Sequence, residues 1–144
     1  MNKLLSCFRQ KKKEPLGSIE LGAYSYMHPD TQVKCWASPC IVKTGKYCSI
    51  AKCKFIFDGN HNPGFATTFP FKELKYNDDA PLNTLKKSPP VLGNDIWISD
   101  DSVIYSGVTI HDGAIIAGQS VVTKDVPAGA TVVGNPARLI SRKN

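Results

Sequence analysis

The chain has 144 residues, of which 42% are hydrophobic and 21% are charged, and its formal net charge is +6. This length fits one domain, and the composition supports a packed core and argues against intrinsic disorder. No stretch approaches the length of a membrane-spanning helix, which argues against an integral membrane protein.

Residues 1–16 form a basic N-terminal segment, with cations at Lys3, Arg9, Lys11, Lys12 and Lys13. "MNKLLSCF" lacks the apolar run of a secretory signal and of a lipoprotein signal, so we expect a cytoplasmic protein. A second basic cluster follows near the other end, at Arg138, Arg142 and Lys143. Basic ends are usually solvated. They also suit a phosphorylated cofactor, an acidic glycan or a peripheral membrane contact through the N-terminus.

The first part of the domain carries aliphatic residues with a period of six, in two runs. The first run is Leu21, Met27 and Val33, and the second is Thr44, Ile50 and Ile56. The two runs are eleven residues apart, one short of two full periods. We expect a bulge or a tightened corner near "KCWASPC" (34–40) to absorb this slip.

Five cysteines occur in this part of the chain and before it, at positions 7, 35, 40, 48 and 53. An odd number without an export signal argues against a disulfide framework. The pairs Cys35/Cys40 and Cys48/Cys53 share a C-x4-C spacing that loosely suggests zinc, but no nearby histidines complete a ligand set. We therefore expect small buried side chains and no metal.

The period stops between residues 59 and 90 and resumes at Leu92, so this segment is predicted to be an excursion loop that leaves the repeating scaffold. Long ordered loops on a rigid scaffold are commonly functional.

From Leu92 an aliphatic residue recurs at every sixth position without a miss. The series is Leu92, Ile98, Ile104, Ile110, Ile116 and Val122. Turn formers such as Asp112-Gly113 follow two and three positions later, and small or β-branched residues such as Ala114 follow four positions later. A spacing of six fits neither a helix nor one long strand. It fits a short extended segment and a corner, repeated.

Three such segments close one coil of a triangular prism, in which neighbouring coils stack ~4.8 Å apart. Each buried aliphatic contributes roughly 1.5–3 kcal/mol, which makes these residues the main source of stability. The sequence thus predicts an all-β, hexapeptide-repeat parallel β-helix over residues 17–140; the spacing does not set its hand. "GNPARLISRKN" (134–144) is predicted to form a short basic helix, with 141–144 as a basic tail.

"LGNDIWISDDSVIYSGVTIHDGAIIAGQSVVTKDVPAGATVVGNPARLI" (92–140) resembles the C-terminal half of hexapeptide-repeat acyltransferases. "NHNPGFATTFPF" (60–71) narrows the resemblance to the xenobiotic acetyltransferase branch, which includes streptogramin and type B chloramphenicol acetyltransferases and many sugar O-acetyltransferases. The resemblance covers about residues 17–140. It implies a left-handed β-helix, acetyl-CoA as co-substrate, no metal, no nucleic-acid partner, and a homotrimer with active sites between subunits.

The resemblance also implies that His61, in the Asn-His pair that opens the excursion, is the general base. A free histidine has a pKa of about 6.5, so it is mostly neutral at cytoplasmic pH and able to accept a proton. It would deprotonate an acceptor hydroxyl as that hydroxyl attacks the thioester. The alternative is that His61 is a loop histidine without a catalytic role.

Other site residues follow from the same resemblance. Five residues match positions that contact CoA in relatives: Trp97, Ala117, Gly118, Lys124 and Arg138. Four residues are expected to contact the acceptor: Tyr26, Asp58, Asn60 and Phe69. Tyr24 belongs to the same tyrosine-bearing stretch as Tyr26. Each has a structural alternative: Trp97 as a subunit contact, Lys124 and Arg138 as solvated charges, Asp58 as a turn cap, and the tyrosines as simple packing.

Two positions depart from the family, which often has Gly at Ser99 and Pro at Ser106. Neither change removes a catalytic group, although Ser99 would narrow the cleft. His28 and His111 are expected to be surface or subunit-contact residues.

The leading functional hypothesis is O-acetylation of a sugar, as a surface-polysaccharide precursor or glycan unit. The alternatives are acetylation of an antibiotic hydroxyl and N-acetylation of an amino sugar. Outside transferases, the prism occurs in γ-class carbonic anhydrases, whose histidine spacing is not matched here, and in non-catalytic structural subunits.

Overall fold

The computed structural model describes residues 17–35, 40–57, 60–72, 76, 79, 84–85 and 87–143. Within these ranges the chain forms short strands and turns. No helix occurs among the described residues, and therefore none there is able to cross a membrane.

The strands of the first half are two to four residues long. They are β1 (Gly17–Glu20), β2 (Tyr26–Met27), β3 (Gln32–Lys34), β4 (Cys40–Lys43), β5 (Ser49–Ile50), β6 (Lys54–Ile56), β7 (Asn60–His61) and β8 (Thr84–Leu85). Those of the second half are β9 (Val91–Leu92), β10 (Trp97–Ile98), β11 (Val103–Tyr105), β12 (Thr109–Ile110), β13 (Ile115–Ile116), β14 (Val121–Val122), β15 (Ala130–Val133) and β16 (Arg138–Arg142).

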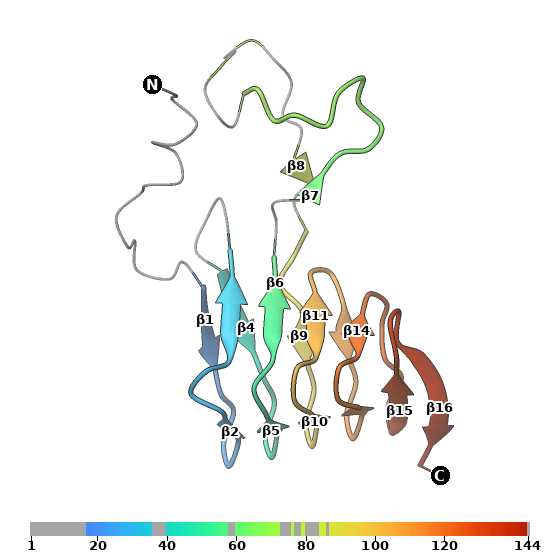
Figure 1. Cartoon of the computed structure of the whole chain (residues 1–144). Helices are drawn as coiled ribbons and strands as arrows, with labels where there is room; N and C mark the ends of the chain where they lie inside the picture. The colour runs from blue at the N-terminus through green and yellow to red at the C-terminus, as the bar shows by residue number, and fades with distance from the viewer. Residues whose placement is uncertain are drawn as a thin grey trace.

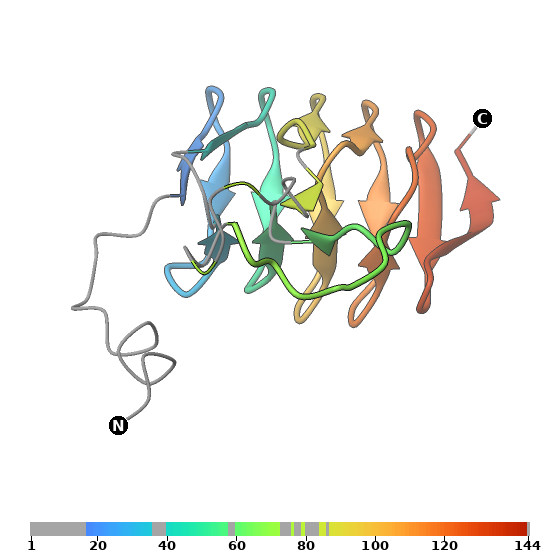
Figure 2. The same cartoon turned by 90° about the horizontal axis from the view of Figure 1, so that it is seen from above.

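Three parallel sheets form the three faces of a prism (Figure 1). The first face is β1-β4-β9-β12, the second is β2-β5-β10-β13-β15 with β16 at its edge, and the third is β3-β6-β11-β14. From β1 to β6 and from β9 to β14 consecutive strands lie on successive faces, and β7 and β8 form a separate sheet. Between β14 and β15 the chain crosses the first face with the single bridge Ile110–Val126. The chain thus coils from β1 at one end of the prism to β16 at the other (Figure 2). The fold is a left-handed parallel β-helix, and the predicted all-β class is confirmed.

We name the corners by the faces they join. The first corner joins the first and second faces and includes residues 93–96 and 111–114. The second joins the second and third faces and includes 99–102 and 117–120. The third joins the third and first faces, includes 123–125, and is where the excursion leaves the prism after β6 and returns at β9. Val126 lies beyond this corner on the first face, where it forms a bridge with Ile110.

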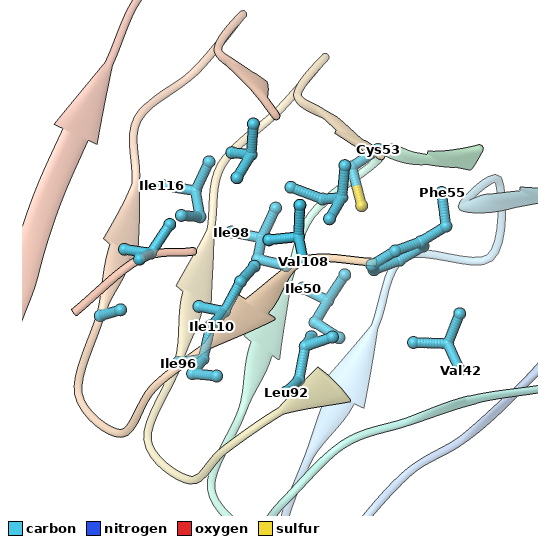
Figure 3. Packing of buried hydrophobic residues seen from close by; sticks show 14 of the residues in the cluster. Val42, Ile50, Cys53, Phe55, Leu92, Ile96, Ile98, Val108, Ile110 and Ile116 are labelled. Atoms are coloured by element: carbon cyan, nitrogen blue, oxygen red, sulfur yellow. The ribbon is translucent and has the colours of Figure 1, made fainter. Parts of the chain in front are cut away.

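The predicted hexad residues form the core (Figure 3). All six aliphatics from Leu92 to Val122 are buried, and so are the six residues four positions after them: Ile96, Ser102, Val108, Ala114, Ser120 and Val126. The buried hydroxyl of Ser102 donates to the carbonyls of Ser99 at 2.8 Å and Ala117 at 3.1 Å, so it carries no unpaired donor. The prediction of one large and one smaller inward residue per hexad is confirmed.

The N-terminal coils depart from the predicted frame at one position. Phe55 lies opposite Ile104 and is fully buried, whereas Ile56 is half-buried and lies opposite Tyr105. The corner between β5 and β6 is one residue shorter than the others, so the sixth-position rule misplaced the inward residue. Leu21 and Met27 are 39% and 37% exposed because they belong to the terminal coil.

The cysteine expectation was partly wrong. Cys35 and Cys40 form a disulfide at the third corner, with their Cα atoms 6.4 Å apart. Cys35 directly follows β3 on the third face and Cys40 begins β4 on the first, a proximity that their spacing alone did not show. Cys48 and Cys53 are free and buried, as predicted. Burial raises the pKa of the Cys53 thiol to about 12, so this thiol is protonated at neutral pH. Cys7 lies outside the described residues.

The predicted C-terminal helix is also wrong. Residues 138–142 form β16, which pairs antiparallel with β15 through Val133–Arg138 and Thr131–Ser141, with a shift in register between them. Gly134, with a φ of 101°, lies in the reversal that makes this pairing possible. The exposed edge of β15 offers unpaired backbone donors and acceptors, which a returning strand satisfies and a helix would not.

Polar side chains tie neighbouring coils together at the corners. Asn94 Oδ1 accepts from the backbone N–H of Lys46 at 2.8 Å, and Asp112 Oδ1 accepts from that of Asn94 at 2.7 Å. The backbone N–H and then the side chain of Asn94 hold the pKa of Asp112 below its usual value. These hydrogen bonds pair backbone N–H groups at the corners that have no partner in the short sheets.

Candidate active site

The excursion is closed at its neck by a short antiparallel ladder. Asn60 pairs with Leu85 and His61 with Thr84, so β7 and β8 hold both strands of the neck together. This places the exposed His61 on the third-corner side of the prism, where the excursion projects (Figure 1).

The imidazole of His61 is oriented by the excursion itself. Its Nδ1 contacts the backbone carbonyl oxygen of Thr68. A carbonyl only accepts hydrogen bonds, so Nδ1 carries the hydrogen and donates it. In this tautomer the lone pair is on Nε2, which is the nitrogen available to accept a proton.

The segment after His61 is ordered by local contacts. Asn62 Oδ1 accepts from the N–H of Gly64 at 2.9 Å, and Thr67 Oγ1 accepts from the N–H of Phe69 at 3.2 Å. The ring of Phe69 packs edge-on against Phe71 at a centroid distance of 4.7 Å and is tilted against Tyr76 at 5.8 Å. Phe69 is therefore part of an aromatic cluster above the prism.

Two of the predicted site residues share the outer surface of the second face. Tyr26, Ser49, Trp97, Ile115 and Thr131 are aligned in register across five strands. Tyr26 is 66% exposed and Trp97 is 53% exposed, with the small Ser49 between them. The two aromatic residues are thus two coils apart, ~9.6 Å, with Ser49 in register between them.

This face lies opposite the third corner. In a three-sided prism the corner between the third and first faces is opposite the second face, so His61 and Trp97 lie on opposite sides of one chain (Figure 1). A single chain therefore does not bring His61 together with Tyr26 and Trp97.

The other predicted cofactor residues are spread over the corners. Ala117 and Gly118 form part of the second corner, where a Cβ on Gly118 would lie 3.4 Å from the Asp100 carbonyl oxygen. Lys124 is exposed at the third corner. Arg138 begins β16, is exposed, and donates from Nη1 to the Ala137 carbonyl at 3.1 Å.

Comparisons with known proteins agree with this architecture. Residues 89–124 match the family pattern "Bacterial transferase hexapeptide (six repeats)". The chain is 39% identical over 105 residues to a chloramphenicol acetyltransferase of Agrobacterium fabrum, covering 69% of this chain and 50% of that protein. It is 40% identical over 105 residues to a probable macrolide acetyltransferase of Lysinibacillus sphaericus, covering 69% and 58%.

The chain carries hexapeptide repeats of this transferase type over residues 89–124 and is similar to these acetyltransferases over 69% of its length. It spans about half the length of the curated relatives it matches. A solved maltose O-acetyltransferase of Clostridium difficile 630 has the same fold, with a TM-score of 0.64 and 24% identity over 88% of this chain and 59% of its own. So does a Vibrio cholerae hexapeptide-repeat acetyltransferase complexed with acetyl-CoA, with a TM-score of 0.66 and 23% identity over 88% and 63%.

The three histidines of the chain lie apart from one another. His28 follows β2 at the second corner, His111 follows β12 at the first, and His61 is in the excursion. Among the described residues no three His, Cys, Asp or Glu side chains gather in a way that would hold a metal ion. Asp58, expected on the acceptor side, lies outside the described residues.

Sequence reasoning missed two contributors to this candidate site. Thr68 orients His61 through its carbonyl oxygen, and a backbone contact leaves no signal in residue type. Ser49 is the residue in register between Tyr26 and Trp97 on the second face. The position of Ser49 could have been predicted, because it directly precedes the hexad residue Ile50. Tyr26 and Trp97 likewise directly precede hexad residues.

Proposed function

We propose that this protein transfers an acetyl group from acetyl-CoA to a hydroxyl of a sugar, with His61 as general base. The observation that carries this proposal is the contact of His61 Nδ1 with the Thr68 carbonyl, which leaves the Nε2 lone pair free. Such a fixed tautomer is what a general base requires.

The reaction is a direct transfer. Nε2 of His61 takes the hydroxyl proton while the acceptor oxygen attacks the thioester carbonyl carbon. The carbon–sulfur bond then breaks, and the CoA thiolate takes the proton back from the imidazolium. No covalent enzyme intermediate is needed, and the proton transfer is worth about 10²–10⁴-fold in rate.

The family and the surface of the prism support acetyl-CoA as the donor. The Vibrio cholerae neighbour is complexed with acetyl-CoA. In this chain the second corner at Ala117 and Gly118 is small and open enough for pantetheine to approach the backbone. Lys124 and Arg138 are exposed cations suited to its phosphates, and Trp97 offers an exposed aromatic surface on the second face.

A homotrimer would complete the site. His61 projects from the third corner while Tyr26 and Trp97 lie on the opposite face, so a neighbouring subunit must supply one half of the constellation. We propose that the excursion of one subunit, with Asn60, His61, Phe69 and Asp58, covers the second face of the next.

A sugar acceptor is supported by the fold neighbour that is a maltose O-acetyltransferase. The second candidate is an antibiotic hydroxyl, favoured by the relatives named chloramphenicol and macrolide acetyltransferases. The third is a sugar amine, since a further neighbour of the same fold, from Bacillus cereus, is an N-acyltransferase. The two hydroxyl acceptors would use His61 as the same base; amino-sugar transferases usually place the base differently, so the amine ranks third.

We further propose a cytoplasmic location, where acetyl-CoA is made, and a peripheral membrane contact through the basic N-terminal residues. Those residues lie outside the described ranges. Disulfides are rare in the cytosol, so this location predicts that Cys35 and Cys40 are largely reduced in the cell.

The test is release of free thiol from acetyl-CoA in the presence of sugar, drug and amino-sugar acceptors. His61→Ala should lower kcat/KM by about 10²–10⁴-fold with an unchanged melting temperature. His111→Ala is the matched control and should keep full activity, because His111 lies at the first corner, whereas the proposed cofactor residues Ala117 and Gly118 lie at the second. Full activity of His61→Ala in a folded protein would remove this residue from the mechanism.

A further inference from the structure

A second aromatic feature lies at the first corner, where each of its residues comes two positions before a member of the Tyr26, Ser49 and Trp97 row, and on a different corner from the excursion. Tyr24 and Tyr47, from neighbouring coils, stack with ring centroids 5.3 Å apart and an interplanar angle of 6°. Tyr24 is 80% exposed and Tyr47 is 58% exposed. The pair therefore presents flat aromatic surface to solvent instead of filling the core.

The backbone at this stack is unusual for tyrosine. Tyr24 and Tyr47 have φ values of 59° and 61°, in the left-handed region. The same position in the following coils is held by Asp95, Gly113 and Gly129, which adopt that region more readily. The corner geometry therefore does not call for an aromatic residue, and bulky residues kept in a disfavoured conformation point to function.

The row formed by Tyr24, Tyr47 and Asp95 at this corner position is also rigid. The N–H of Tyr47 donates to the Ala23 carbonyl at 3.0 Å, that of Asp95 to Lys46 at 2.8 Å, and that of Gly113 to Asn94 at 2.9 Å. These bonds fix the coils against one another, so the two rings are held in place before any ligand arrives. A preorganised surface loses little freedom on binding.

A carboxylate continues the row one coil beyond Tyr47. Asp95 is exposed, and among the described residues its carboxylate has no hydrogen-bond or ion-pair partner. A flat aromatic surface beside a free carboxylate matches a sugar ring. The C–H face of a pyranose packs on the aromatic ring, and its hydroxyls donate to the carboxylate.

We propose that Tyr24, Tyr47 and Asp95 form a binding subsite for the rings of an oligosaccharide. The row spans two coil spacings, ~9.6 Å, so its aromatic and carboxylate ends can contact different rings of one chain. The choice of a glycan as ligand rests on the proposed function, and the subsite would make the natural acceptor a glycan chain instead of a single sugar.

The experiment measures binding in the absence of acetyl-CoA. Maltohexaose, chitohexaose and an oligomer of sialic acid are titrated into the full chain and followed by saturation-transfer NMR and calorimetry. At least one should bind, with saturation passing from tyrosine rings to sugar C–H protons. Tyr24→Gly and Tyr47→Gly should each weaken binding at least tenfold without lowering the melting temperature, because glycine adopts the left-handed conformation freely.

Controls separate a sugar platform from other roles. Tyr24→Phe keeps the ring and should keep binding, and Ile140→Ala, at an exposed apolar residue on the terminal strand β16, should leave it unchanged. The proposal is overturned if none of the three oligosaccharides binds, or if binding survives both glycine variants. It is also overturned if Tyr24→Gly dissociates the oligomer in light scattering, since the pair would then be a subunit contact.

The outcome is independent of the chemistry at His61. Binding through Tyr24 without acetyl transfer to any acceptor would leave this inference standing and contradict the proposed function. Transfer that depends on His61 but shows no oligosaccharide binding would do the reverse.

Discussion

The prism from Leu92 to Val132 and the excursion from Asn60 to Leu85 are held together in different ways. In the prism each coil buries aliphatic side chains and repeats the backbone bonds of the coil before it. In the excursion most described side chains are exposed, and the order comes from one short ladder, an aromatic cluster and side-chain bonds to the backbone. Stability is thus concentrated in the scaffold, and the candidate chemistry sits in the part that contributes least to it.

The strongest test of this comparison is a core deletion in the prism. Ile110 is fully buried and pairs with Leu92 on the first face. Ile110→Ala removes packed methyl groups and should lower the free energy of unfolding by about 2–5 kcal/mol. Urea denaturation followed by Trp fluorescence measures the change. A loss below about 1 kcal/mol would mean that the coils do not depend on their aliphatic stack.

The matched test in the excursion is Phe69→Ala, because Phe69 is also a large apolar residue. Its ring is 36% exposed and packs on Phe71 and Tyr76 outside the prism. We expect a change in unfolding free energy below about 1 kcal/mol and a fall in kcat/KM of about tenfold, ~1.4 kcal/mol in the barrier. An equal loss of stability in the two variants would contradict the division between scaffold and site.

The smallest effect concerns a corner of the prism at low pH. The hydrogen bonds from Asn94 lower the pKa of Asp112 from its ordinary value of 3.8, so the folded state favours the carboxylate. The resulting stability is present above pH 3.8 and is lost as the pH falls through the folded-state pKa.

Asp112→Asn should therefore be less stable than the wild type at pH 7, and this difference should shrink as the pH falls below 3.8 in a series of urea melts. Asp95→Asn is the control, because the described structure gives that side chain no hydrogen-bond partner. If the stability difference between Asp112→Asn and the wild type does not change with pH, the effect comes from side-chain geometry and not from the carboxylate charge.

The sequence alone determined the repeating part of this protein. A period of six from Leu92 to Val122 is a local pattern, and each coil obeys it for the same steric reason, so the faces, the inward residues and the corners could be predicted. The motif "NHNPGFATTFPF" likewise marked the excursion and the xenobiotic acetyltransferase branch, in agreement with relatives at 39% and 40% identity. The roles of His61, Trp97 and the other site residues remain proposals.

Only the tertiary structure decided the features that depend on which segments meet. The Cys35–Cys40 disulfide forms because the ends of β3 and β4 come together at the third corner. Strand β16 forms because the edge of β15 is open to pairing. The His61 tautomer is set by the contact of Nδ1 with the Thr68 carbonyl. The stack of Tyr24 on Tyr47 needed two coils in contact. A periodic pattern specifies a residue's position within its own coil. Contacts between different parts of the chain depend on the path that the backbone takes through the fold, and the spacing of residues in the sequence does not specify that path.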